Sequence, residues 1–269
     1  MSEELNTNWR KVASSIYKKP TDSKIYGSVD IDVTELENFI VKKRREGVKT
    51  TLTHLLTLIV ARAFREEVPE LNAFVRRGKI IRRKSIDATV SVLLKGAEMG
   101  SVNIPNCDQL NVSELTDIIA AKIKDSRSGN ENNTMQSKQM LSSIPWPFRS
   151  WLFYLYKKIT IDWGISIPGM NLSSDSFGSF LISNIGTLGL DSGYAALLPS
   201  SNVSIVLIIG KVYKKPLVIN DEIVIRKVLS LSATLDHRVV DGYHGGKLFR
   251  YIRRIIKQPE LLNIKPEIL

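Results

Sequence analysis

The chain has 269 residues, of which 43% are hydrophobic and 24% are charged, as is typical of a soluble globular protein. A single cysteine, Cys107, excludes an intramolecular disulfide framework and suits a reducing compartment, so we expect a cytoplasmic protein. The net charge of +11 attracts anions, but no zinc-finger spacing or aromatic-rich RNA-binding motif accompanies it, so we do not expect nucleic acid binding. The amino terminus resembles no secretory signal, and no uncharged apolar run approaches the roughly 20 residues that span a bilayer.

Period-two alternation predicts strands in the first half of the chain, and apolar residues at helical spacing predict helices between them. The expected strands are 25–33, a hairpin over 74–81 and 86–94, and the expected helices are 34–47, 53–67 and 112–123. We interpret His54, which lies among apolar neighbours, and Cys107 as structural residues. The pattern indicates one α/β domain over 1–269.

Residues 125–177 form an inserted or divergent segment. Their first part, 125–139, is rich in Ser and Asn and predicts a loop. The stretch 144–164 holds three of the four tryptophans, and its apolar residues are too dense for a solvated helix. We favour an extra helix that packs on the core.

The last third of the chain predicts a buried strand over 203–209, a hairpin that turns at Asn220-Asp221, and a strand over 229–236 with one buried face. A helix capped by Asp241 follows and ends near Lys257. His237 and Asp241 therefore lie four residues apart at a strand end. The imidazole is either a structural group held by Asp241 or a general base. The second role suits histidine in general, because an imidazole changes its charge near neutral pH.

The sequence around this histidine, SLSATLDHRVVDG at 230–242, closely resembles the motif of the acyltransferase core of 2-oxo acid dehydrogenase complexes. The continuation DGYH resembles the chloramphenicol acetyltransferases, which share that core fold. The resemblance is loose over 9–124 and close over 178–262. It implies an α/β fold in which helices flank a mixed sheet, and a homotrimer whose active site is a channel between neighbouring subunits.

The resemblance implies a general base at His237 and a positioning role for Asp241. Arg10, in a WRKVASSI segment that resembles the family's opening, would form an ion pair with Asp241, and Arg238 is the other candidate partner. No acyl-enzyme is implied, so transfer would be direct.

A second motif, GSFLISNIG at 178–186, resembles the family's Gly-Thr-Phe-Thr-Ile-Ser-Asn-Leu-Gly strand. Ser183 matches the serine that donates a hydrogen bond to the oxyanion, and Asn184 follows it as a supporting residue. Leu181 replaces the family's second threonine, which alters the polar contacts beside the site. Without the resemblance, Ser183 and Asn184 would indicate only a turn at a strand end.

The implied function is acyl transfer between coenzyme A and a dihydrolipoyl-like thiol or another small acceptor. Acyl-CoA would be the co-substrate and no metal is expected. The chain contains no lipoyl-type segment, so we expect either a separate lipoyl or acyl carrier protein or, the option we favour, a stand-alone enzyme. A catalytically inactive trimeric scaffold is the alternative. For the aromatic segment, the alternatives to a packed helix are an acyl-pocket wall, a carrier-protein contact and a membrane contact through 144–158.

Overall fold

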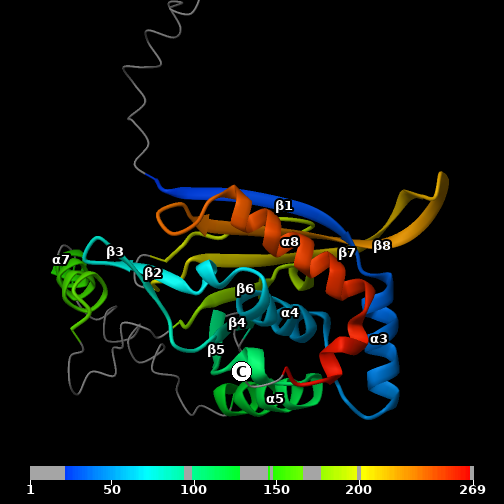
Figure 1. Ribbon diagram of the computed structural model, residues 1–269. Coiled ribbons are helices and arrows are strands. Elements are labelled where there is room, and N and C mark those ends of the chain that lie inside the picture. Colours follow the sequence, from blue (N-terminus) through cyan, green and yellow to red (C-terminus); the bar gives the residue numbers. More distant parts are fainter. Residues whose placement is uncertain are drawn as a thin grey trace, which may run out of the picture.

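The computed structural model describes residues 22–93, 99–127, 145, 148–165, 177–198 and 201–266, which form a mixed sheet covered by helices (Figure 1). Six strands of the described part pair in the order β1-β8-β7-β6-β4-β5. They are β1 (Lys24–Asp32), β4 (Ala88–Leu93), β5 (Met99–Ile104), β6 (Phe180–Asn184), β7 (Ile205–Ile219) and β8 (Glu222–Asp236). β6 is parallel to β4 and β7, and the other neighbouring strands are antiparallel. The predicted α/β fold with a mixed sheet is confirmed.

The helices contribute to the apolar core on one side of this sheet. The α-helices that do so are α3 (Thr34–Arg45), α4 (Leu52–Glu66), α5 (Val112–Arg127) and α8 (Gly242–Lys257), and the short ones are η1 (Pro69–Leu71), η3 (Cys107–Gln109) and η6 (Pro259–Asn263). The exposed η5 (Gly186–Leu188) follows β6 and adds nothing to this core. Every residue of α4 from Leu55 to Phe64 is buried. That run includes Arg62, whose guanidinium donates hydrogen bonds to the carbonyls of Leu110, Leu261 and Ile264 at 3.0, 2.8 and 2.6 Å. A buried cation thus ties the chain's last turn to the central helix.

Strand β8 is buried on both faces over residues 228–236, so the predicted single buried face is wrong. Alternating apolar side chains face the helices, as the period of two predicts. The polar side chains between them are buried as well. Hydroxyl pairs compensate part of this burial: Ser230 and Ser232 lie 3.1 and 3.2 Å from Ser28 of β1.

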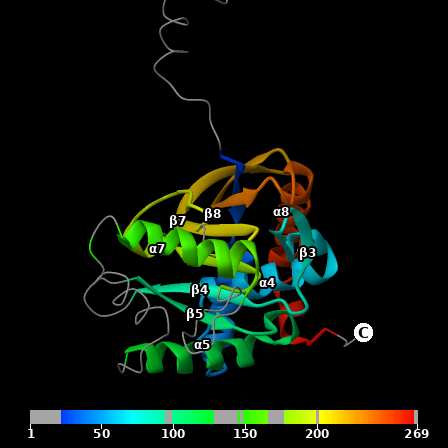
Figure 2. The same ribbon diagram turned by 90° about the vertical axis from the view of Figure 1, so that its left-hand side faces the viewer.

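The hairpin β2–β3 (Ala73–Arg76 and Lys79–Arg82) and the aromatic segment lie together at one end of the molecule (Figures 1 and 2). The segment forms α7 (Phe148–Tyr156), which continues directly into a π-helical turn, η4 (Lys157–Asp162). Thr160 and Ile161 of η4 are buried, but most described side chains of α7 are exposed. The prediction of a helix packed on the core therefore holds for η4 and is wrong for α7. No helix of the described residues is long and apolar enough to cross a membrane.

Candidate active site

The turn that carries His237 is fixed by the residues on either side of it. The buried carboxylate of Asp236 accepts hydrogen bonds from Arg238, from its Nε at 2.9 Å, its Nη2 at 2.6 Å and its backbone N–H at 3.0 Å. Burial alone would raise the pKa of Asp236, but the bonds from Arg238 outweigh it, so the pKa lies below its usual value. The backbone N–H of His237 donates to the carbonyl of Ser23 at 2.8 Å. These contacts leave the turn little freedom.

The imidazole of His237 is exposed and has a defined tautomer. Its Nδ1 lies 3.0 Å from the carbonyl oxygen of Val240. A carbonyl can only accept, so Nδ1 carries the proton in the neutral ring. Nε2 is then unprotonated and can accept a proton from another molecule, which is the property that a general base requires.

Asp241 caps α8, as predicted. Its carboxylate accepts from the backbone N–H of Tyr243 at 2.9 Å and lies 3.0 Å from Nδ1 of His244. Desolvation would raise its pKa, but the bonds from His244 and Tyr243 outweigh it and lower the pKa. The predicted ion pair with Arg238 is wrong, because Arg238 binds the carboxylate at the start of the turn. Arg10 lies outside the described residues, so its ion pair with Asp241 stays a prediction.

Ser183 is 9% exposed and lies on the sheet face opposite the helices, in the wall of an apolar pocket of about 520 Å³. Leu181 and Ile185 share this face, since side chains alternate along β6. The neighbouring Asn184 points its amide to Thr53 of α4, with 3.0 Å between Nδ2 and Oγ1. Asn184 thus anchors the end of β6 to the first turn of the central helix, while the Ser183 hydroxyl is available to the pocket.

One chain does not bring Ser183 and His237 together. The strand register places Ser183 beside Ile208, and Ile208 beside Ser232 of β8. His237 follows five residues further along β8, at the opposite end of the sheet from β6's carboxyl terminus. With about 3.3 Å per residue and about 4.8 Å between strands, the two residues are roughly 19 Å apart. A reaction that uses both needs one of them from a second chain.

A family model described as "2-oxoacid dehydrogenases acyltransferase (catalytic domain)" matches residues 3–142 and 171–264. The chain belongs to this family. The resemblance of the two motifs, which lie in 178–186 and 230–244, is therefore confirmed, and both lie inside the second matched stretch. Residues 143–170, which contain α7 and η4, lie between the two matched stretches.

Relatives in this family are dihydrolipoyllysine-residue acetyltransferase components of pyruvate dehydrogenase complexes. The protein of Rickettsia bellii (strain RML369-C) is 25% identical over 264 residues, which cover 96% of this chain and 53% of the relative. A Staphylococcus aureus (strain N315) protein is 41% identical over 81 residues, 30% of this chain and 18% of that protein. The chain thus spans about half the length of the relatives that it matches most fully.

Solved structures show the same fold. The dihydrolipoamide acetyltransferase of Azotobacter vinelandii has a TM-score of 0.66 and 18% identity, with 96% of this chain and 98% of that chain covered. A probable dihydrolipoamide acetyltransferase of Listeria monocytogenes has a TM-score of 0.64 and 20% identity, with 87% and 84% covered. The fold of the family is therefore present nearly throughout the chain.

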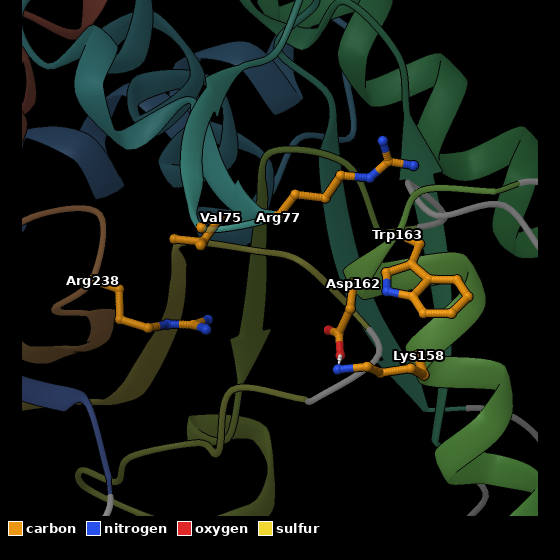
Figure 3. Close-up of a pocket in the computed structure, with 7 residues that line it drawn as sticks. Val75, Arg77, Lys158, Asp162, Trp163 and Arg238 are labelled. Carbon is orange, nitrogen blue, oxygen red and sulfur yellow. Dashed lines mark ion pairs between the residues drawn. The ribbon is translucent and has the colours of Figure 1, made fainter.

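The fixed turn borders a second pocket that the sequence did not predict (Figure 3). Its volume is about 620 Å³, and Arg238 of the turn, Arg77 of the hairpin, and Lys158, Asp162 and Trp163 of the aromatic segment line it. In Figure 3 the Lys158 ammonium points to the Asp162 carboxylate, 3.8 Å away, and the Trp163 indole lies beside them. This pocket joins elements that are far apart in sequence, so local pattern could not predict it.

The other nucleophilic and titratable candidates are structural, as predicted. Cys107 is completely buried, and burial raises the pKa of its thiol, so it is a poor nucleophile. Burial lowers the pKa of His54 to about 4, so its imidazole is neutral at physiological pH. Among the described residues, no group of three or more His, Cys, Asp or Glu side chains could hold a metal ion.

Proposed function

We propose that this chain is an acyltransferase that moves an acyl group between coenzyme A and a dihydrolipoyl-like thiol or another small acceptor. The observation that carries the proposal is the His237 turn, which holds an exposed imidazole with Nδ1 on a carbonyl and Nε2 without a partner among the described residues. Membership of the acyltransferase family supports the reaction class. The relatives act within pyruvate dehydrogenase complexes, and such a role for this chain is part of the proposal.

In the proposed reaction, Nε2 of His237 accepts the proton of the attacking thiol, because the thiolate is the nucleophile. The sulfur then bonds to the carbonyl carbon of the bound thioester, and the electron pair of the C=O bond moves to oxygen. The Ser183 hydroxyl stabilises this oxyanion, which is typically worth about 3 kcal/mol. When the oxyanion collapses, the C–S bond to the leaving thiol breaks and the imidazolium returns its proton to that sulfur.

The proposed site lies between two chains of a homotrimer, with His237 from one and Ser183 from its neighbour. Their roughly 19 Å separation within one chain supports this arrangement. The study of the Azotobacter protein concerns the roles of a serine, a histidine and an asparagine in its catalytic mechanism, and that histidine and asparagine are four positions apart. His237 and Asp241 have the same spacing, and Asp241 would position the turn by capping α8.

Coenzyme A would bind in the pocket beside the turn, because basic side chains line this pocket and coenzyme A carries phosphates. Arg77, Lys158 and Arg238 line it, and guanidinium and ammonium groups bind phosphates through charge-assisted hydrogen bonds. The indole of Trp163 offers a surface for a purine base. The apolar pocket at Ser183 would take the acyl side of the thioester.

Formation of coenzyme A and acyl-dihydrolipoamide from acetyl-CoA and from longer acyl-CoAs, with dihydrolipoamide as acceptor and the products separated by chromatography, tests the proposal. We expect turnover by the wild type and a loss of at least about a hundredfold in His237→Ala. Sedimentation would show that the variant keeps the oligomeric state of the wild type. A wild type that assembles but turns over no acyl-CoA of any length would refute the proposal and favour the inactive scaffold.

A further inference from the structure

The exposed face of α7 has a composition opposite to that of an ordinary surface helix. Phe148, Trp151 and Tyr154 are 66%, 63% and 62% exposed, and Leu152 and Leu155 are 38% exposed each. At 100° per residue these five side chains cover an arc of about 160°. Phe153 and Tyr156 occupy the remaining side and pack on each other with ring centroids 6.2 Å apart. The helix therefore presents its apolar stripe outward.

Basic residues without acidic partners border this stripe. The turn and second strand of the β2–β3 hairpin carry Arg77, Lys79 and Arg82, for which no ion pair forms within the described part of the chain. The hairpin turn and η4 line one pocket, and Figures 1 and 2 both show β3 close to the α7–η4 segment. By contrast, Lys215 and Arg226 of the β7–β8 hairpin pair with Asp30 and Asp32. Unneutralised positive charge is thus available next to exposed aromatic surface.

We propose that α7 and the β2–β3 hairpin form an interfacial surface that binds an anionic lipid bilayer. Aromatic side chains can insert at the headgroup boundary while Arg77, Lys79 and Arg82 contact lipid phosphates. The charge beside the stripe supports an anionic lipid partner, because Arg77, Lys79 and Arg82 form no ion pair within the described part of the chain and are complementary to lipid phosphates. The inference does not depend on the proposed acyl transfer.

The test is flotation with vesicles of phosphatidylcholine alone and of phosphatidylcholine mixed with phosphatidylglycerol. We expect the wild-type chain of 269 residues to float only with the anionic vesicles, and less so as salt is raised. The variant Phe148→Ser/Trp151→Ser/Tyr154→Ser should bind at least about tenfold more weakly, because it loses the inserted apolar area. The variant Arg77→Ser/Lys79→Ser/Arg82→Ser should lose about fivefold for each cation removed.

The matched control is Val218→Ser/Ile223→Ser/Ile225→Ser on the β7–β8 hairpin, which removes apolar side chains that are 72%, 79% and 70% exposed elsewhere on the surface. This control should float like the wild type. The inference would be overturned if the wild type floated with neither kind of vesicle. It would also be overturned if the serine variant of α7 floated to the same extent as the wild type. If the wild type binds no vesicles and the serine variant of α7 has a changed oligomeric state, the stripe contacts a second copy of the chain instead. Loss of binding to a lipoylated carrier domain, again without vesicle binding, would assign it to that protein.

Discussion

Mixing two inactive variants tests most directly whether the site is shared between chains. His237→Ala removes the proposed base and leaves Ser183 intact, and Ser183→Ala does the reverse. Neither homotrimer can form a working site, because every chain of the first lacks the histidine and every chain of the second lacks the serine. A mixed trimer can, wherever a Ser183→Ala chain supplies its histidine to a His237→Ala neighbour.

The expected magnitude follows from symmetry. In a cyclic trimer each site takes one histidine and one serine from adjacent chains, so random mixing in equal amounts makes about one site in four intact. The mixture should therefore reach about a quarter of wild-type activity. Each parent should remain below about 1%, since an oxyanion donor alone contributes about 100- to 1,000-fold.

The assay is formation of coenzyme A and acyl-dihydrolipoamide, separated by chromatography, by trimers made by co-expressing the two variants with different tags and purifying on both tags in turn. This selection raises the intact fraction to about one site in three, because every retained trimer contains both chains and has one working arrangement out of its three sites. Activity no higher than that of the parents, in trimers shown to contain both chains, would refute the shared site. The role of Ser183 would then have to be abandoned, or the two side chains would have to meet inside one chain.

Three further predictions concern the supports of the site. Asp236→Asn should lower the free energy of unfolding by about 2 kcal/mol at neutral pH. Because the folded-state pKa of Asp236 is depressed, its contribution is present above the unfolded-state pKa and is lost as the pH falls through the folded-state value, so urea midpoints of variant and wild type should converge in acid. Arg62→Met should cost about 3 kcal/mol in the same titration, since it leaves buried carbonyls without donors. Cys107 should react with a thiol reagent only after unfolding; reaction in the native protein would contradict its complete burial.

Local pattern was enough to predict most of the elements. The turn Asn220-Asp221 has φ of 51° and 64°, the left-handed values that a tight hairpin needs. Asn and Asp are favoured at such positions, so the residue types predicted this turn. The strand before His237, the cap at Asp241 and the helix to Lys257 were equally visible, because each depends on neighbours within a few residues. The family resemblance added the pairing of two motifs that lie about fifty residues apart.

What the sequence did not reveal depends on contacts between distant segments. Arg238 was one of two candidate partners of Asp241, but it pairs with Asp236, which lies two residues before it. Burial of β8 on both faces depends on packing that the alternation of its own residues does not show. The pocket beside the turn likewise combines the hairpin, η4 and Arg238. Register and packing decide such features, and neither is encoded in local periodicity.

The segment between the two matched stretches is linked to the proposed base through side-chain contacts. Residues 143–170 lie outside the matched family core, yet η4 buries Ile161 and lines the same pocket as Arg238. Arg238 in turn holds Asp236, which precedes His237. A ligand bound to η4 in this pocket would therefore be separated from the turn that orients the imidazole only by the side chain of Arg238. Variation placed on such a segment can alter substrate access while the sheet that carries the reaction stays the same.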